Sequence, residues 1–330
     1  MLQNSYTKED TIFVQIVSYR DPELQHTLQD LFKKAKRPEN IFVGICHQYD
    51  MKGDEDNHLF TVPFPRKNQI RIDVIDYRQS NGCCFARNRV QKLWKNEKWT
   101  LMIDSHSRFE ENWDEICVSI AKKYECDEKI LLSSYVCQYF LDGKKEKHIG
   151  GTNAKFDKAM NIFIMTGMRE LKKNMAFVSG HFMFSNSLFI KTISYDPHIY
   201  FMGEEISISV RAWTNGYKIL NPNQVILYHL YRSTKNTSHR KIHEDKNKLN
   251  QKSLSRVQHL LNTKKTNRLE ILEDIDSYNL GKTRTLRDYE RFSGLDFRKM
   301  KYREHSKQGV FQEWQEVSNI QTIKKIFQQI

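Results

Sequence analysis

The sequence has few cysteines and no long apolar run, and these absences exclude several classes of protein. Its six cysteines include an adjacent pair at 83–84 but no C-x-x-C pair, and no secretory leader precedes them. The sequence therefore predicts neither a disulfide framework nor a zinc site, and a reducing cytoplasm fits best. No apolar stretch approaches the roughly 20 residues that span a bilayer, so we expect no integral membrane segment. Internal repeats and low-complexity tracts are absent as well.

What the chain does carry is positive charge. It has 53 Lys and Arg against 40 Asp and Glu, a formal net charge of +13. This excess predicts attraction to something anionic, such as a phosphorylated substrate, an acidic membrane face or nucleic acid. The basic residues are dispersed and densest at 235–268 and 282–307, with no nucleic-acid motif beside them. Nucleic acid is therefore the less favoured partner, and peripheral contact with an acidic surface stays open.

Apolar patterning predicts a layered α/β protein. With 330 residues and 39% hydrophobic content, the chain can bury the core of one large domain plus an appendage. Short β-branched runs alternate with stretches that have apolar residues at helical spacing. This alternation is typical of a mostly parallel sheet covered by helices. The expected strands are 11–18, 41–46, 70–76, 101–104 and 130–136, and the expected helices follow Pro22 (with Asp21 as cap), lie near 83–97 and span 112–124.

The remaining chain is harder to interpret. Residues 138–175 carry glycines and lysines that predict loops over a sheet edge, and a second organised block runs from 176 to 231. Beyond 233 the chain becomes polar, basic and helical in pattern. Its irregular apolar stripe, Leu249, Val257, Leu260 and Leu261, favours packing on the main domain over binding a partner helix. We therefore predict a catalytic domain at 1–235 and a basic, mainly helical extension at 236–330.

An Asp-x-His sequence ends the fourth expected strand, and it is the most informative motif. Side chains alternate faces along an extended backbone, so Asp104 and His106 project from the same side and can hold one divalent cation together. A cation there would lie at the carboxyl end of a sheet, where α/β proteins bind nucleotides. Taken alone, the motif fits a strand end with a capping Asp and a surface His better than it fits a metal site.

Three other segments add what a metal and nucleotide site needs. Glu204 and Glu205 follow a glycine at an expected helix start, where carboxylates are also favoured for purely structural reasons. A short strand delivers His229, which can complete a metal shell, and then Arg232, which can neutralise a leaving phosphate. Residues 82–87 begin a helix that can receive a diphosphate, with Arg87 one turn inside it.

Support is thinner for nucleotide contacts near the amino terminus. Ser18 and Arg20 leave the first strand, and Asp76 ends the third with a carboxylate that can meet uracil or ribose. Each has a structural alternative: a turn residue for Ser18, a surface ion pair for Arg20 and a cap for Asp76. We rank the functional interpretation first for Arg20 and Arg87 and leave Asp76 undecided.

Together these stretches resemble a known family. Residues 16–22 (IVSYRDP), Ile103 to His106 with Trp113 soon after, Gly203-Glu-Glu and 284–294 (RTLRDYERFSG) are similar to the GlcNAc-transferase family that includes the cytoplasmic enzyme glycosylating a hydroxyproline on a ubiquitin-ligase adaptor. The similarity covers roughly residues 11–300. More distantly, Asp104-Ser-His106, Gly203-Glu204, Arg211-x-Trp213 and His229-x-x-Arg232 resemble the mucin-type polypeptide GalNAc-transferases.

The resemblance implies a GT-A fold, a UDP-sugar donor, a Mn²⁺-like ion and transfer with retention of configuration. By position it makes Asp104, His106 and His229 metal ligands, Arg232 a diphosphate contact and Glu204 a sugar or acceptor contact. Asp-x-His replaces the commoner Asp-x-Asp, and imidazole suits a transition ion better than Mg²⁺. The expected activity is transfer of a sugar, GlcNAc first, from UDP to a hydroxyl of a protein or glycan.

Two alternatives stay open at this point. A basic protein that binds nucleic acid or an acidic surface on a transferase scaffold is consistent with the charge. A sugar-nucleotide hydrolase or pyrophosphorylase-like enzyme also holds a metal and a diphosphate. For a transferase, retention can use a carboxylate nucleophile, with Glu204 and Glu205 as candidates, or same-face attack, which the resemblance favours. No nucleophile is assigned.

Overall fold

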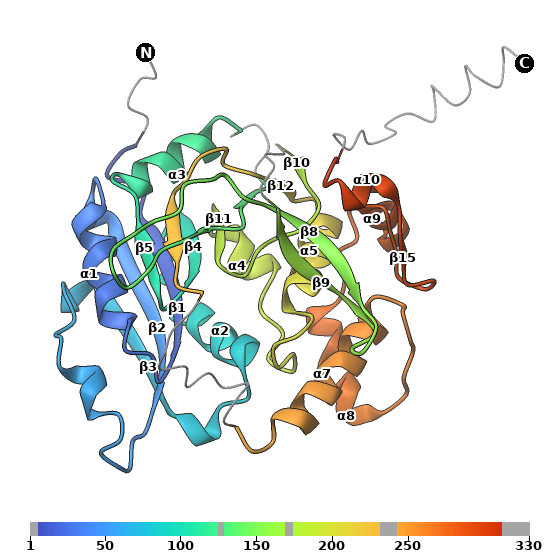
Figure 1. The fold of residues 1–330 in the computed structure, drawn as a ribbon, viewed down its shortest axis with the longest axis horizontal. Coiled ribbons are helices and arrows are strands. Elements are labelled where there is room, and N and C mark those ends of the chain that lie inside the picture. Colours follow the sequence, from blue (N-terminus) through green and yellow to red (C-terminus); the bar gives the residue numbers. More distant parts are fainter. Residues whose placement is uncertain (1–5, 125–128, 169–173, 232–242, 312–330) are drawn as a thin grey trace, which may run out of the picture.

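A central eight-stranded sheet organises the molecule in the computed structural model, which describes residues 6–124, 129–168, 174–231 and 243–311 (Figure 1). Most neighbouring strands are parallel, and the antiparallel pairs involve β10 and β11. This arrangement confirms the predicted mostly parallel α/β sheet. In sheet order the strands are β10 (Asn174–Met175), β12 (Lys218–Leu220), β6 (Ile130–Ser133), β11 (Phe182–Asn186), β4 (Trp99–Asp104), β1 (Ile12–Tyr19), β2 (Ile41–Tyr49) and β3 (Ile70–Asp76).

Helices cover both faces of the sheet because its strands are apolar on both sides. Ile12, Val14 and Ile16 of β1 share one buried cluster with α1 (Leu24–Lys34) and α3 (Trp113–Lys122). Phe13, between them in sequence, points the other way and packs with α2 (Cys83–Gln91). Further along that second face, α5 (Glu204–Thr214) buries its apolar side against β4, β6 and β11. The continuous apolar strands therefore specify three layers.

A small second sheet lies at the carboxyl end of β4 and positions the candidate site. Its strand order is β5 (Ser107–Phe109), β13 (Leu227–His229) and β7 (Cys137–Gln138). The register places His229 opposite Ser107, three residues after the end of β4. Pairing between segments far apart in the chain thus brings His229 beside Asp104.

The structure differs from the sequence prediction in three places. The helix expected near 83–97 ends at Gln91, and the strand expected at 130–136 ends at Ser133. Within the region expected to be loops, β8 (Gly151–Asp157) and β9 (Ile162–Met168) form a hairpin of seven residue pairs. Phe163 of this hairpin is buried against the distant Phe297, at a ring-centroid distance of 5.7 Å. A tertiary contact of this kind leaves no periodic signal in the local sequence.

The carboxy-terminal segment packs into the same core as α5. Val257, Leu260 and Leu261, three of the four predicted stripe residues, belong to that cluster together with Tyr289. The predicted boundary at 235 falls in 232–242, outside the described residues, and stays a prediction. The elements here are α7 (Lys246–Leu260), α8 (Leu269–Leu272), α9 (Leu286–Ser293), β14 (Leu295–Asp296), β15 (Lys301–Tyr302) and α10 (Glu304–Lys307).

Short elements complete the described chain. Helix α4 (Leu188–Thr192) follows β11, and five 3₁₀ turns lie in the connections. None of the described helices has the length and apolar content needed to cross a membrane. The described cysteines are free thiols. The 3₁₀ turns are Pro38–Asn40, Asn57–Phe60, Lys67–Gln69, Tyr77–Gln79 and Ile275–Tyr278.

Candidate metal and nucleotide site

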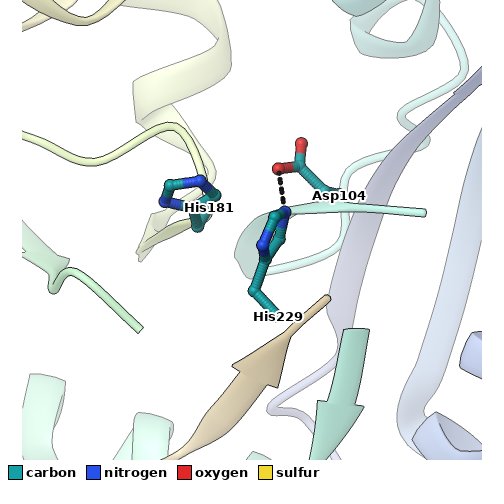
Figure 2. A group of neighbouring side chains, drawn as sticks. All are labelled: Asp104, His181 and His229. Carbon is teal, nitrogen blue, oxygen red and sulfur yellow. Dashed lines mark hydrogen bonds and ion pairs between the residues drawn. The ribbon is translucent and has the colours of Figure 1, made fainter. Parts of the chain in front are cut away.

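Asp104 and His229 meet at the end of the central sheet. Asp104 is the last residue of β4 and His229 the last of β13, and the Oδ2 of Asp104 lies 3.1 Å from Nε2 of His229. They are separated by 125 positions in sequence. The structure therefore brings together two of the three metal ligands that the sequence predicted (Figure 2).

His181 is the third potential ligand in this place, and the sequence analysis did not name it. One ligand atom each from Asp104, His181 and His229 lie within 4.8 Å of one another, and Figure 2 shows the three side chains gathered from different elements. The Nδ1 atom of His229 is buried and has no hydrogen-bond partner among the described residues. A carboxylate with two imidazoles is a donor set that suits a transition ion such as Mn²⁺. These residues therefore fit the implied cation.

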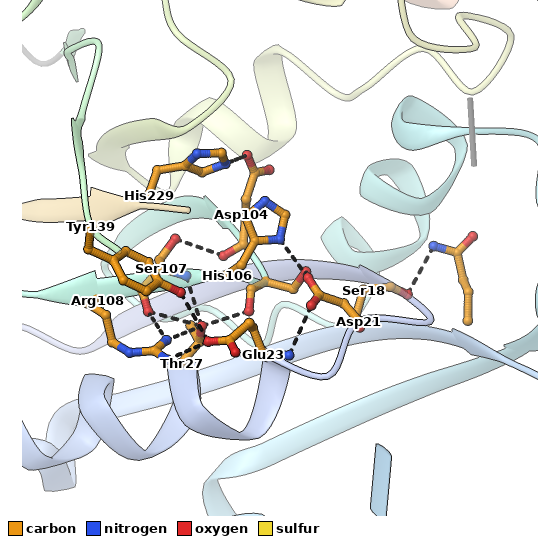
Figure 3. Close-up of polar contacts among 12 residues, drawn as sticks. Ser18, Asp21, Glu23, Thr27, Asp104, His106, Ser107, Arg108, Tyr139 and His229 are labelled. Atoms are coloured by element: carbon orange, nitrogen blue, oxygen red, sulfur yellow. Dashed lines mark hydrogen bonds and ion pairs between the residues drawn. The ribbon is translucent and has the colours of Figure 1, made fainter. Parts of the chain in front are cut away.

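His106 lies next to this group with one ring nitrogen already engaged. Its Nδ1 is 2.6 Å from Oδ2 of Asp21, and its ring centroid is 4.6 Å from that of His229 (Figure 3). Asp21 also accepts from the hydroxyl of Ser105 and from the backbone N–H of Glu23. Asp21 was expected to cap α1, but the residue before the helix is Glu23, and Asp21 holds His106 instead. Only Nε2 of His106 is left for a metal.

Burial and neighbouring charges shift the pKa values of the candidate ligands. Burial raises the pKa of Asp104, but the hydrogen bond with His229 and the charge of Arg87 bring it well below its usual range. Burial lowers the pKa of His229, and burial together with the charge of His229 lowers the pKa of His181 to about 3. At pH 7 the carboxyl is therefore ionised and the imidazoles of His181 and His229 are neutral. Burial lowers the pKa of His106, but the charge of Asp21 and the hydrogen bond with it raise that pKa to about 9, so His106 must lose a proton before it binds a metal.

Arg87 is the buried cation behind Asp104. Its Nη2 donates to Oδ1 of Asp104 at 3.0 Å and to the carbonyl of Gly180 at 3.1 Å, and its Nη1 donates to the Tyr195 hydroxyl at 3.2 Å. Its Nε lies 3.3 Å from Oε1 of Glu204. Only 3% of the residue is exposed. The sequence predicted a diphosphate contact for Arg87, and the structure commits its guanidinium to internal partners.

Glu204 and Glu205 begin α5, as the sequence predicted, and both face the Arg87 region. Burial raises the pKa of Glu204, with Arg87 opposing. Oε1 of Glu205 accepts the backbone N–H of Gly180 at 2.7 Å, and burial raises the pKa of Glu205 to about 7. The loop that carries His181 is thereby fixed from two sides, because Arg87 holds the Gly180 carbonyl and Glu205 holds its N–H.

The helix that contains Arg87 does not present a free amino terminus. The N–H of Cys83 donates to the carbonyl of Tyr200 at 2.9 Å. Gly82 has a φ of +104°, and a Cβ there would collide with that same carbonyl oxygen. The backbone of Tyr200 therefore lies against the start of α2, where the diphosphate site was expected.

The predicted amino-terminal contacts lie at the ends of β1 and β3. Ser18 is fully buried, with no partner for its hydroxyl among the described residues. Arg20 pairs with Asp56 at 2.9 Å and with Glu55, and its guanidinium lies 4.3 Å from the centre of the Tyr77 ring.

Asp76 has the structural role that the sequence left open. It accepts the backbone N–H of Arg78 at the start of a 3₁₀ turn and pairs with the Arg78 guanidinium at 2.6 Å. These interactions with Arg78 lower the pKa of Asp76 to about 2. Arg232, the predicted diphosphate contact, lies outside the described residues. Nucleotide binding by Ser18, Arg20, Asp76 and Arg232 stays a prediction.

His181 and Asp21 were missed because neither carries a spacing signal. His181 stands alone on the loop before β11, and the isolated Ser179–Phe182 bridge fixes that loop only in the folded state. Asp21 sits at a position typical of a helix cap, which explained it without a metal-site role. The Ser-Gly-His sequence directly after a buried apolar run was the one available clue to His181.

Three features define the class of this protein: the mostly parallel sheet, the helices on both of its faces, and the carboxylate–imidazole pair at the end of β4. The class is an α/β glycosyltransferase of the GT-A fold. A family model described as Glycosyltransferase (GlcNAc) matches residues 11–62 and 51–299. The chain belongs to this family. A search of curated protein sequences finds no match.

Solved structures are similar to this chain. GalNAc-T7 with UDP, GalNAc and Mn²⁺ aligns with 76% of this chain and 48% of its own, at 17% identity and a TM-score of 0.55. This chain thus spans about half the length of that protein. S. aureus TarS 1-349 in complex with UDP-GlcNAc aligns with 76% of this chain and 66% of its own, at 12% identity and a TM-score of 0.46.

Proposed function

We propose that this protein is a metal-dependent, retaining glycosyltransferase that moves a sugar from a UDP-sugar to a hydroxyl group of a protein or glycan. The observation that carries the proposal is the contact between Asp104 and His229 at the carboxyl end of the sheet, 3.1 Å apart. Family membership makes GlcNAc the first sugar to test. The fold shared with GalNAc-T7, whose structure contains UDP, GalNAc and Mn²⁺, supports the donor class.

Asp104 and His229 are the proposed core of the metal site. His106, predicted from the sequence, and His181, gathered by the fold, are the candidates for a further ligand, with ring centroids 4.6 and 4.3 Å from that of His229. A divalent cation bound there supplies positive charge for the diphosphate that leaves the sugar. The pair between His106 and Asp21 resembles the carboxylate–histidine arrangement that orients metal-binding imidazoles.

Arg87 and Glu204 act behind the site. Arg87 keeps Asp104 ionised and directs its Oδ1 away from His229, which leaves Oδ2 toward the imidazole. Glu204 balances the buried charge of Arg87. Arg232 is the proposed contact for the departing phosphate, and Ser18, Arg20 and Asp76 line the proposed uridine side. These roles are predictions from the sequence.

The course of transfer and the acceptor are the finer parts of the proposal. Same-face attack is favoured by the family resemblance, and neither Glu204 nor Glu205 is assigned as a nucleophile. The resemblance of residues 284–294 to the hydroxyproline GlcNAc-transferases favours a protein hydroxyl, and a glycan hydroxyl is the second acceptor class. A cytoplasmic location accords with free thiols in the described residues.

The direct test is release of UDP from a panel of UDP-sugars, with and without Mn²⁺. We expect release to require the cation and to fall at least about 100-fold in Asp104→Asn, because the amide removes the charge that binds the metal. Asp142→Asn is the matched control, since that side chain is 54% exposed and forms a surface ion pair with Lys144. Unchanged turnover in Asp104→Asn would reject the metal assignment. Free sugar without a glycosylated acceptor would indicate a hydrolase.

Two further variants separate the candidate ligands. His181→Ala and His106→Ala are compared for Mn²⁺ affinity in the presence of UDP. We expect loss of a metal ligand to weaken binding by more than about 100-fold, whereas loss of a side chain that only orients a ligand costs about 10- to 100-fold. If both variants bind Mn²⁺ like the wild type, the site uses neither imidazole.

A further inference from the structure

The edge strand β3 lacks several of the devices that usually prevent edge strands from pairing, although Arg71, Asp73 and Asp76 give it charge. It forms the last position of the central sheet and runs in register with β2 over seven consecutive residue pairs, with no bulge. Its sequence, IRIDVID, contains no proline, glycine or lysine. Ile72 and Val74 are 40% and 38% exposed. Long, regular and apolar edges are templates for another strand, and soluble proteins normally protect them.

The strand is also complementary to itself. When two antiparallel copies pair with Ile72 opposite Ile72, the register places Ile70 opposite Val74 on one face. On the other face it places Arg71 opposite Asp73, twice by symmetry. Each position then meets a partner of matching chemistry, and opposite charges across antiparallel strands are stabilising. Centring the pair on Asp73 instead would set two carboxylates against each other.

We propose that β3 pairs with β3 of a second copy of this chain to form a two-fold symmetric dimer. The central sheet then continues from one copy into the other, and backbone groups at both edges gain partners. An interface of this kind uses the same surface on both copies and closes on itself, so it yields a dimer and no filament. We choose a second copy of this chain as the partner because the charged residues of β3 face residues of opposite charge when two copies pair antiparallel.

The side chains around the edge accommodate this pairing. Arg71 forms an ion pair with Glu97, and Asp73 forms one with Arg89, both on the α2 side. The side chains of Arg71 and Asp73 are still 18% and 22% exposed to solvent. The new contacts therefore join existing ion pairs into a network. On the apolar side, Phe60 is 46% exposed, and its ring lies 5.7 Å from that of His47, the residue paired with Val74. This ring widens the apolar strip.

The proposed interface is independent of the proposed catalytic role. Two strands, β2 and β1, separate β3 from β4, which carries Asp104. Figure 1 shows β3 at the outer side of the sheet, beyond β2. Dimerisation can therefore be measured without any donor or metal, and its failure would leave the metal site untouched.

Light scattering coupled to gel filtration gives the first test. At protein concentrations of tens of micromolar, the wild type should elute with twice the chain mass of 39.4 kDa, and dilution should shift it toward the monomer. Ile72→Lys sets two ammonium groups opposite each other and should yield the monomer, with an unchanged thermal midpoint. Ile72→Thr is the control, since a β-branched residue keeps the strand. A monomeric wild type at all concentrations would overturn the proposal.

Cross-linking tests the register. Ile72→Cys puts two thiols directly opposite, so a short bis-thiosulfonate reagent should join the copies. Val74→Cys is the matched control, because its thiol faces Ile70 of the other copy and should cross-link weakly. Equal yields for both variants, or none above that of the wild type, would refute the register.

Exchanged charges give the sharpest result. Arg71→Asp and Asp73→Arg each set like charges across the pair, so each variant alone should dissociate about tenfold more readily than the wild type. An equimolar mixture restores both pairs, since aspartates then meet arginines, and should form a heterodimer. A mixture no more dimeric than its components would contradict the proposal, because a loss caused by misfolding cannot be rescued by mixing.

Discussion

Replacing Arg87 tests whether that residue is a structural cation or an exposed nucleotide contact. In Arg87→Met the carboxylates of Asp104 and Glu204, 3.0 and 3.3 Å from the guanidinium, lose their shared counter-ion. Removing one partner from a buried ion pair costs about 3–5 kcal/mol, since the remaining charge stays buried. We expect a loss of that size in the free energy of unfolding.

Arg89→Met is the matched control in the same helix. Arg89 pairs with Asp73, but its side chain is 36% exposed, and ion pairs at the surface contribute about 0–1 kcal/mol. Urea unfolding followed by tryptophan fluorescence, in chelator and without nucleotide, measures both variants. Equal losses would refute the reasoning, as would an Arg87→Met protein of normal stability that fails only to bind UDP.

Three further predictions concern other parts of the fold. Gly82→Ala should lower the free energy of unfolding by about 2 kcal/mol or more, because its φ of +104° excludes a side chain; a change below about 0.5 kcal/mol would contradict this. His47 is buried with both ring nitrogens unpartnered among the described residues, and burial lowers its pKa from 6.5 to about 4. The unfolded chain therefore binds the proton first, and stability falls as the pH drops from 6.5 to 4, by about 2 kcal/mol at pH 5. His47→Phe should remove that loss, and an unchanged acid slope in chemical unfolding would disprove it. Arg256→Met should cost about 3–5 kcal/mol through Asp196, its buried partner at 2.7 Å, and an unchanged thermal midpoint would argue against it.

The sequence predicted those parts of the fold that depend on local periodicity. Alternating apolar runs predicted strands β1, β2, β3, β4 and β6 of the central sheet and the helices between them, because apolar strands and amphipathic helices must bury the same faces wherever they pack. The β8–β9 hairpin was missed because its stability comes from distant partners such as Phe297. Helix α2 was predicted to be too long, because residues at helical spacing continue to Trp94 in the sequence. In the structure the helix ends at Gln91.

The candidate site was likewise predicted only in part from the sequence. Asp104 and His229 were predicted from motifs at strand ends, where the fold leaves side chains projecting from the sheet. His181 and the hold of Asp21 on His106 were not, because side chains from loops meet only through the tertiary fold. The sequence predicted a diphosphate contact for Arg87, and only its burial in the fold shows that its guanidinium has internal partners.

The most direct measurement of the central claim is Mn²⁺ binding, followed by electron paramagnetic resonance, in the presence of UDP. The wild type should bind the ion at a single site, and His229→Ala should weaken Mn²⁺ binding about 10-fold or more. Asp104→Asn should bind Mn²⁺ more weakly than His229→Ala does. His198→Ala is the control, because that imidazole lies outside the cluster. If His229→Ala and Asp104→Asn bind Mn²⁺ as tightly as the wild type and this control, the account is contradicted.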